Sequence, residues 1–231
     1  MPIHDWTKVP AGIFHDFHFL WAVDLSRSLN AGILPSNFYA MVEPAIPLEA
    51  TDQECQIVGE NASNDLGPSV CDIVREPQLY TARRRRVVVR NERFDTTSAA
   101  TEIVAPGNKS RSKEVDEFVA RATCAFDEGL SLQLIDLFPA GPFDPNGMHG
   151  VLWSRLGGHY EQPADKPLTL AAYAAAGAVT CYVEPTAVGT KLIDMPLFLT
   201  PERYVNVPLE KTYLAAYEGL PQRWRRVIEA E

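Results

Sequence analysis

A carboxylate and an ammonium group stand close together near the middle of the chain. Residues 101–105 (Thr-Glu-Ile-Val-Ala) form an apolar stretch that ends at Pro106-Gly107, and Lys109 follows directly after this turn. Alternate side chains of a β-strand share a face, so Glu102 is expected beside Val104 in an otherwise apolar strand. A buried carboxylate costs free energy unless it has a partner. Glu102 and Lys109 are therefore the first candidates for a functional site.

The residues after the turn are suited to an anion. We expect them at the N-terminus of the next helix, where unpaired backbone amides and cationic side chains attract negative charge. The candidate anion-binding residues are Asn108, Ser110, Arg111 and Lys113. They do not form a P-loop, because Asn108 rather than glycine precedes Lys109 and Val104 occupies the position of the upstream glycine.

Positive charge is concentrated around the same stretch. The chain has a formal net charge of -9, but residues 83–113 hold nine Lys or Arg residues and three acids, a balance of +6. The overall charge argues against wholesale binding to nucleic acid or to a membrane surface. The basic region 83–113 predicts a local contact with nucleic acid or another anion, and the alternative is an Arg-rich hairpin face in solvent.

Other chemical patterns are weak. His15 and His18 could share a helix face, but no third metal ligand is identifiable, so packing or capping roles are favoured. The four cysteines are widely spaced, which favours buried reduced thiols over a zinc knuckle or a disulfide framework. Neither Ser69, Cys71 nor Cys124 stands in a recognisable nucleophile motif.

The elements that must position these residues form a mixed α/β core. Apolar spacing predicts a helix over residues 15–31, strands over 37–43 and 69–74, a short strand at 55–59, and a hairpin of strands over 84–91 and 97–105. A helix that follows Ser112 as its N-cap and stops at Gly129 precedes an apolar strand over 130–138. This strand-helix-strand order predicts a parallel crossover.

Proline and glycine become more frequent after residue 140. We expect helices over residues 146–156, 168–176, 209–218 and 221–229, a strand over 181–184, and edge or wrapping strands over 194–199 and 203–208. No repeat or low-complexity linker divides the chain. The sequence predicts a single domain over 1–231, with a core of about 12–139 and a wrapping C-terminal extension of about 140–231 that could pack against a second copy.

Membrane and export signals are not recognisable. No apolar run approaches the roughly 20 residues that cross a bilayer. The first residues (Met-Pro-Ile-His-Asp-Trp) lack the basic and apolar regions of a signal peptide. We therefore expect a cytoplasmic protein without a membrane partner.

Several segments carry a resemblance to known sequences. They are residues 1–7 (Met-Pro-Ile-His-Asp-Trp-Thr), 12–18, 102–109, 194–197 and 207–210. Together they resemble an uncharacterised bacterial domain-of-unknown-function family over almost the whole chain. The central Glu-Ile-x-x-Pro-x-Asn-Lys stretch is similar to PD-(D/E)XK restriction-endonuclease-like proteins. This resemblance implies an α/β fold with a restriction-endonuclease-like core (helix, three strands, helix, strand) and a proline-rich C-terminal extension.

The resemblance also implies a site, from which this sequence departs twice. In active PD-(D/E)XK nucleases, carboxylates on neighbouring strands hold a divalent metal, and a Lys two positions after one of them helps to activate water. Glu102 matches the strand carboxylate. Val104 stands in place of the lysine, and Ser69 stands in place of the aspartate that follows proline.

Substitutes for the missing groups follow from the same resemblance. Lys109 could fold back to replace the strand lysine, so Glu102 and Lys109 are the implied catalytic residues. The implied ligands of Mg or Mn are Glu102, Asp72 and Glu43, the last from a neighbouring strand. The expected function is metal-dependent phosphodiester hydrolysis at a degenerate active site. The alternative is a non-catalytic anion- or partner-binding module, in which Lys109 and the candidate anion-binding residues present backbone amides and cations at a helix N-terminus. The purely structural interpretation is that Glu102 pairs with an Arg of the hairpin and that Lys109 is a solvated cation beside a helix start.

Overall fold

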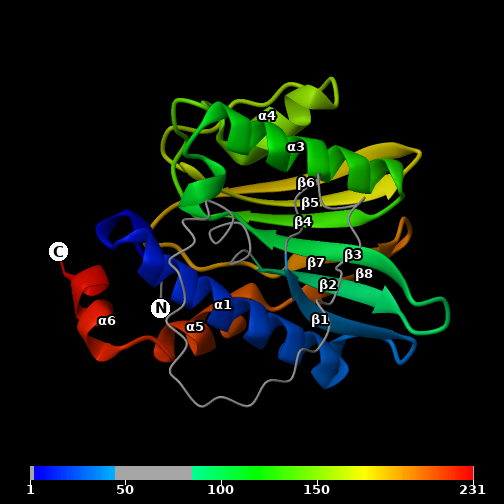
Figure 1. Cartoon of the computed structure of the whole chain (residues 1–231), viewed down its shortest axis with the longest axis horizontal. Helices are drawn as coiled ribbons and strands as arrows, with labels where there is room; N and C mark the ends of the chain where they lie inside the picture. Colours follow the sequence, from blue (N-terminus) through cyan, green and yellow to red (C-terminus); the bar gives the residue numbers. More distant parts are fainter. Residues whose placement is uncertain (1–2, 45–84, 231) are drawn as a thin grey trace, which may run out of the picture.

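The computed structural model describes residues 3–44 and 85–230, which are built around a six-stranded sheet with its strands in chain order (Figure 1). Neighbouring strands are antiparallel except β3 and β4, which are parallel. The strands are β1 (Phe38–Pro44), β2 (Arg85–Asn91), β3 (Thr96–Ile103), β4 (Ser131–Asp136), β5 (Leu168–Ala176) and β6 (Ala178–Thr186). The mixed α/β class predicted from the sequence is confirmed.

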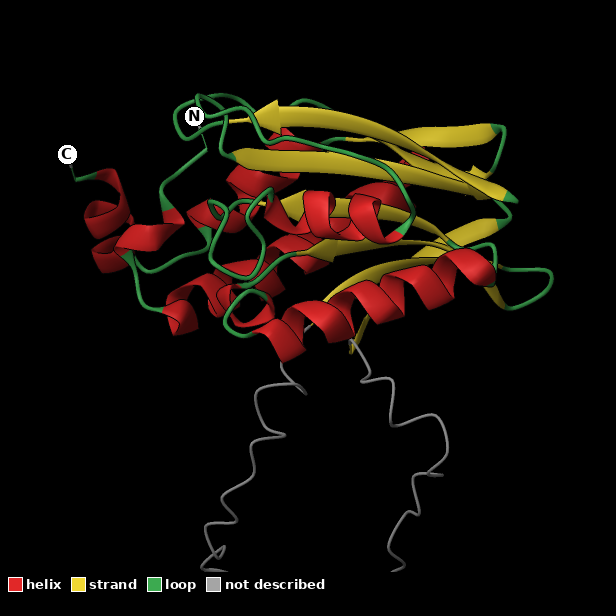
Figure 2. Cartoon of the chain, turned by 90° about the horizontal axis from the view of Figure 1, so that it is seen from above, coloured by secondary structure: helices red, strands yellow, loops and turns green. Residues whose placement is uncertain are grey.

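One face of the sheet is covered by N- and C-terminal elements together (Figure 1), and Figure 2 shows the strands and the helices around them from above. These are η1 (Trp6–Lys8), α1 (Ala11–Ser28), η2 (Leu29–Ile33), the two-stranded sheet of β7 (Met195–Thr200) and β8 (Arg203–Val207), α5 (Leu209–Glu218) and α6 (Gln222–Glu229). Their core is aromatic. Trp21 is fully buried, its ring lies 5.2 Å from that of Tyr213, and its indole N–H donates to Thr212 Oγ1 at 3.0 Å. Burial of such large rings stabilises the docking of α5 on α1.

The opposite face of the sheet is covered by α3 (Ser112–Asp127) and α4 (Gly147–Arg155). Alternating strand residues such as Val88, Ala100 and Leu134 point to these helices and form a second core with Phe118 and Met148. The helix α3 connects β3 to β4, so the predicted crossover between parallel strands is confirmed. The described chain thus runs helix, three strands, helix, strand through β4.

Two predictions of secondary structure are wrong. Residues 168–176 form β5, a strand inside the sheet, and not a helix. The run Leu-Thr-Leu-Ala-Ala-Tyr-Ala-Ala-Ala is buried on both faces, so the two-residue period of a half-exposed strand is absent and the alanines favour a helix locally. Ser112 is the first residue of α3, whereas Arg111 is its N-cap and makes no side-chain cap.

The segment after residue 140 contributes to the sheet as well as covering it. The strands β5 and β6 extend the sheet beyond β4, while β7 and β8 lie across its α1 face as the expected separate strands. The predicted strands over 55–59 and 69–74, and with them Asp72, lie outside the described residues. Within residues 3–44 and 85–230, no helix has the length and apolar character that crossing a bilayer demands.

Candidate functional site

Glu102 lies on β3 and faces a cation. Its side chain is 16% exposed, and one of its oxygens is 4.0 Å from a guanidinium nitrogen of Arg86 on β2. The same guanidinium is 3.9 Å from a carboxylate oxygen of Glu43 on β1. The salt bridge to the Arg-rich hairpin, which was the alternative for Glu102, is therefore present.

Glu43 and Glu102 are not on neighbouring strands, which corrects the placement expected from the sequence. Strand β2 lies between β1 and β3, so the two acids come from strands roughly 10 Å apart. A divalent ion needs its oxygen ligands about 2.0–2.6 Å away. The guanidinium of Arg86 occupies the space between the carboxylates, so this pair does not fit a shared Mg or Mn ion.

Of the other residues in the implied metal site, Asp72 lies outside the described part of the chain. Val104, which stands at the lysine position, is fully buried against α3 and α4 in the apolar core. Throughout the part of the chain that the structure describes, no three His, Cys, Asp or Glu side chains gather as a metal-binding group.

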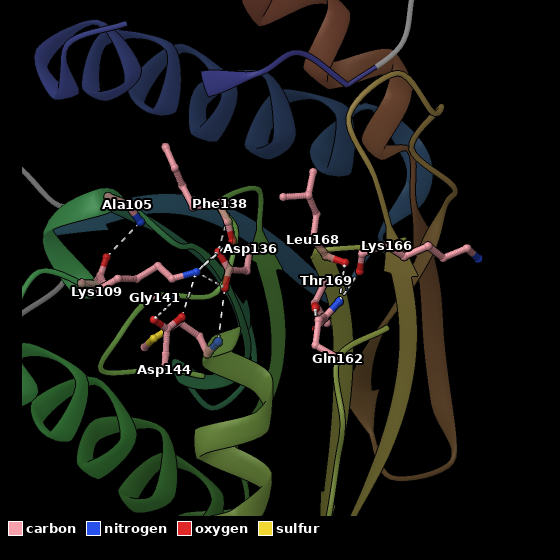
Figure 3. A network of polar contacts seen from close by, with 12 residues as sticks. Ala105, Lys109, Asp136, Phe138, Gly141, Asp144, Gln162, Lys166, Leu168 and Thr169 are labelled. Atoms are coloured by element: carbon pink, nitrogen blue, oxygen red, sulfur yellow. Dashed lines mark hydrogen bonds and ion pairs between the residues drawn. The ribbon is translucent and has the colours of Figure 1, made fainter. Parts of the chain in front are cut away.

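Lys109 is buried and its side chain is directed towards Asp136 and Asp144 (Figure 3). Its ammonium nitrogen lies 2.9 Å from Asp136 Oδ2 and 2.9 Å from Asp144 Oδ2, and it donates to the carbonyl oxygen of Phe138 at 2.8 Å. All three charged side chains are at most 7% exposed. The expectation of a solvated cation at this position is wrong.

The two aspartates connect the lysine to the surrounding backbone. Asp136, the last residue of β4, accepts hydrogen bonds from the amides of Phe138 and Met148, both at 3.2 Å. Asp144 Oδ1 accepts from the amide of Gly141 at 2.9 Å, while the partner of its Oδ2 is the charge of Lys109. The cluster therefore joins the turn after β3, the end of β4, the loop before α4 and the first turn of α4.

Positive and negative groups are unequal in number in this cluster, because one ammonium group faces two carboxyl groups. Burial raises the pKa of Asp136 above its ordinary value, and the charge of Lys109 and the hydrogen bonds from the ammonium and the two amides oppose that rise. A buried ion pair is stable only when its members have further hydrogen bonds, which is the case for Asp136. We name Lys109, Asp136 and Asp144 the lysine cluster.

The predicted anion-binding residues do not converge on one point. Asn108 is buried, and its side-chain oxygen accepts from the amide of Ala105 at 3.0 Å. Ser110 is exposed and donates to the carbonyl oxygen of Gly107. Arg111 and Lys113 are also exposed, and Lys113 lies 3.6 Å from Glu117 on the next turn of α3.

Much of the basic region is engaged in ion pairs within the chain. Arg90 on β2 lies 3.4 Å from Glu43 and 3.4 Å from Asp95. Arg86, Lys109 and Lys113 are paired as described above. Fewer cations are therefore available to an anion in solvent than the count over residues 83–113 suggests.

A second polar cluster lies between α4, β5 and β6, and its groups are neutral. His149 Nδ1 lies 2.6 Å from the hydroxyl of Tyr173 and 4.0 Å from the sulfur of Cys181. Burial lowers the pKa of His149 to about 4 and raises the pKa of the Cys181 thiol to about 12. A neutral thiol is a poor nucleophile, so this pair is not an activated cysteine.

A groove runs beside the lysine cluster between α3 and α4. It has a volume of about 800 Å³ and is lined by Asp116, Val119, Ala120, Phe143, Pro145, Asn146, Gly150, Val151, Ser154 and Arg155. Residues on both sides of Asp144 belong to this lining. The lysine cluster therefore fixes one wall of the groove.

Sequence reasoning missed Asp136 and Asp144 as members of a site. Asp136 stands in the run Leu-Ile-Asp-Leu-Phe, and the criterion applied to Glu102, an acid within an apolar strand, would have identified it. Asp144 lies in a loop of Gly, Pro and Phe residues without regular spacing. No local pattern distinguishes it from a solvated acid.

Comparisons with protein-family models, with curated proteins and with solved structures gave no match for this chain.

Proposed function

We propose that this protein is a non-catalytic partner-binding module built on a restriction-endonuclease-like core. The observation that carries the proposal is the position of Arg86, whose guanidinium lies between Glu43 and Glu102. In a metal-dependent nuclease the strand carboxylate would bind a divalent cation, which would compensate its charge. Here the charge of Glu102 is compensated by an arginine of the same sheet, so the acid needs no metal to be stable.

The bonding of Lys109 supports the same proposal. Lys109 donates hydrogen bonds to the carboxylate of Asp136 and to the carbonyl oxygen of Phe138, and its charge pairs with Asp144. A lysine that activates water must reach that water in the open site. Lys109 instead stabilises the loops that form the groove.

The nuclease-like ancestry itself rests on the order of elements. The described chain runs α1, then β1, β2 and β3, then α3 and β4, with β3 and β4 parallel. This order agrees with the core implied by the Glu-Ile-x-x-Pro-x-Asn-Lys resemblance. Fold alone does not establish an activity, and the groups on this scaffold favour binding over hydrolysis.

The groove between α3 and α4 is where we place the partner. Its volume of about 800 Å³ is in the range of ligand sites. Val119 and Phe143 offer apolar surface, whereas Asp116 and Arg155 contribute one charge of each sign from the two helices. This lining fits a peptide segment with an apolar side chain beside charged ones.

The first test separates binding from hydrolysis. Wild-type protein and Glu102→Ala are incubated with single- and double-stranded DNA and RNA in the presence of Mg²⁺ or Mn²⁺. We expect no difference between the two proteins in cleavage. Metal-dependent cleavage by the wild type that Glu102→Ala abolishes would refute the proposal and restore the nuclease hypothesis.

The second test locates the binding surface. Peptides selected from a random phage-displayed library on the wild type are titrated against Ala120→Trp, which places an indole in the groove, and against Ala11→Trp, which changes another exposed alanine, on α1. We expect binding to be weakened at least tenfold by Ala120→Trp and unchanged by Ala11→Trp. Equal binding to all three proteins would show that the groove is not the site.

A further inference from the structure

The turn between β2 and β3 presents an exposed aromatic ring. Phe94 is 65% exposed, the largest exposed fraction among the large hydrophobic side chains that the structure describes. The guanidinium of Arg93 lies 5.3 Å from the centre of its ring. Phenylalanine and arginine are both enriched at protein interfaces relative to the rest of the protein surface.

Several hydrogen bonds support the conformation of this turn, although it projects from the sheet. The amide of Glu92 donates to the carbonyl oxygen of Asn37 at 2.9 Å, and the hydroxyl of Tyr39 donates to Asp95 Oδ1 at 2.9 Å. Arg90 donates to the carbonyl oxygen of Asp95 at 3.0 Å. Asp95 has a φ of 49°, a left-handed conformation that these contacts hold in place. Phe94 can therefore bind a partner without the cost of ordering the turn.

A groove of complementary character lies at the same end of the sheet. It has a volume of about 500 Å³ and is formed by the segment that leads into β1, the end of β2 and the β7–β8 turn. The β7–β8 turn and the β2–β3 turn lie at the same end of the sheet in Figure 1. Phe38, Leu199 and Val205 give it an apolar wall, and the exposed residues Glu202 and Arg203 lie on it. This second groove is large enough for a phenylalanine side chain.

We propose that the occupant of this second groove is the β2–β3 turn of a second copy of the chain. Phe94 would enter the apolar part, and Arg93 would meet Glu202 of the other copy. The reverse charges also match, because Glu92 on the turn would meet Arg203 of the other copy. Charge complementarity of this kind selects one partner and orientation.

The turn and the second groove belong to one continuous surface, which favours a reciprocal dimer. Asn91 both lines the groove and holds the turn, because its side-chain oxygen accepts from the amide of Arg93 at 3.0 Å. In a twofold dimer the same patch of each copy contacts the other, so each turn fills the groove of its partner. Dimerisation through this patch is independent of whether the core binds a metal.

The test is sedimentation velocity over a concentration series of the full chain. We expect a monomer–dimer equilibrium in the wild type and a dissociation constant at least tenfold higher for Phe94→Ala. The matched control is Phe19→Ala, which removes another exposed phenylalanine, 47% exposed, on α1 and should leave the dimer unchanged.

A charge exchange tests the pairing directly. Arg93→Glu and Glu202→Arg should each weaken the dimer, and the double variant Arg93→Glu/Glu202→Arg should recover most of the lost affinity. Circular dichroism confirms that each variant is folded. A wild type that stays monomeric at all concentrations, or assembles beyond a dimer, would overturn the proposal, as would a double variant weaker than either single one.

Discussion

Replacement of Lys109 by methionine is the most informative perturbation of this structure. The change keeps an unbranched side chain of similar length but leaves Asp136 and Asp144 buried without their cation. Removing one partner of a buried ion pair costs about 3–5 kcal/mol, because the remaining charge is uncompensated. For a chain of 231 residues this lowers the melting temperature by roughly 6–20 °C.

The assay is urea unfolding followed by tryptophan fluorescence at pH 7, with Lys113→Met as the control. Lys113 also pairs with an acid, Glu117, but its side chain is 76% exposed, so its removal should cost no more than about 0.5 kcal/mol. Equal losses for Lys109→Met and Lys113→Met would refute the buried lysine cluster.

The pH dependence of Lys109→Met gives a second check on the same reasoning. Burial already raises the pKa of Asp136 above its ordinary value of 3.8, so the folded state holds this proton more tightly than the unfolded state. That contribution to stability is present below pH 3.8 and is lost as the pH rises through the folded-state pKa. Without the lysine charge the pKa of Asp136 rises further, so the deficit of Lys109→Met should shrink towards acid pH.

Two further predictions concern α1 and the groove. Burial lowers the pKa of His18 to about 4 from 6.5, so the free energy of unfolding falls as the pH drops from 6.5 towards 4, by roughly 3 kcal/mol at most. Urea unfolding at pH 7 and at pH 5 should show a smaller loss of stability in His18→Gln than in the wild type. An equal loss in the two proteins would show that His18 does not cause it. A Cβ at Gly150 would lie 2.5 Å from the Cβ of Asn146, so Gly150→Ala should cost about 1–3 kcal/mol by thermal unfolding, whereas the control Gly12→Ala, in open space, should not destabilise.

The order of elements could be predicted from the sequence because local patterns determine it. The apolar stripe of α3 lies at helical spacing, and the turn at Pro106-Gly107 separates it clearly from β3. The strand β5 could not be identified in this way. Its neighbours β4 and β6 and the layers above and below bury it, and none of these is visible in the nine residues of the strand itself.

The candidate site was predictable only in part, for a similar reason. The acid in β3 was recognised, and its arginine partner was among the alternatives. The partners of Lys109 are 27 and 35 residues away in sequence, and only the folding of α3 and the loop before α4 brings them together. Local spacing carries no information about such a contact, so the sequence suggested for this lysine only a place beside Glu102 or a place in solvent.

The lysine cluster also restricts how this sequence can change over time. Loss of the lysine alone leaves two buried acids, and loss of either acid alone removes a support of the loop beside the groove. Positions 109, 136 and 144 should therefore vary together among descendants of this chain, with all three charges kept or all three replaced by neutral groups. A lineage that kept the acids without the cation would have to supply positive charge from another residue.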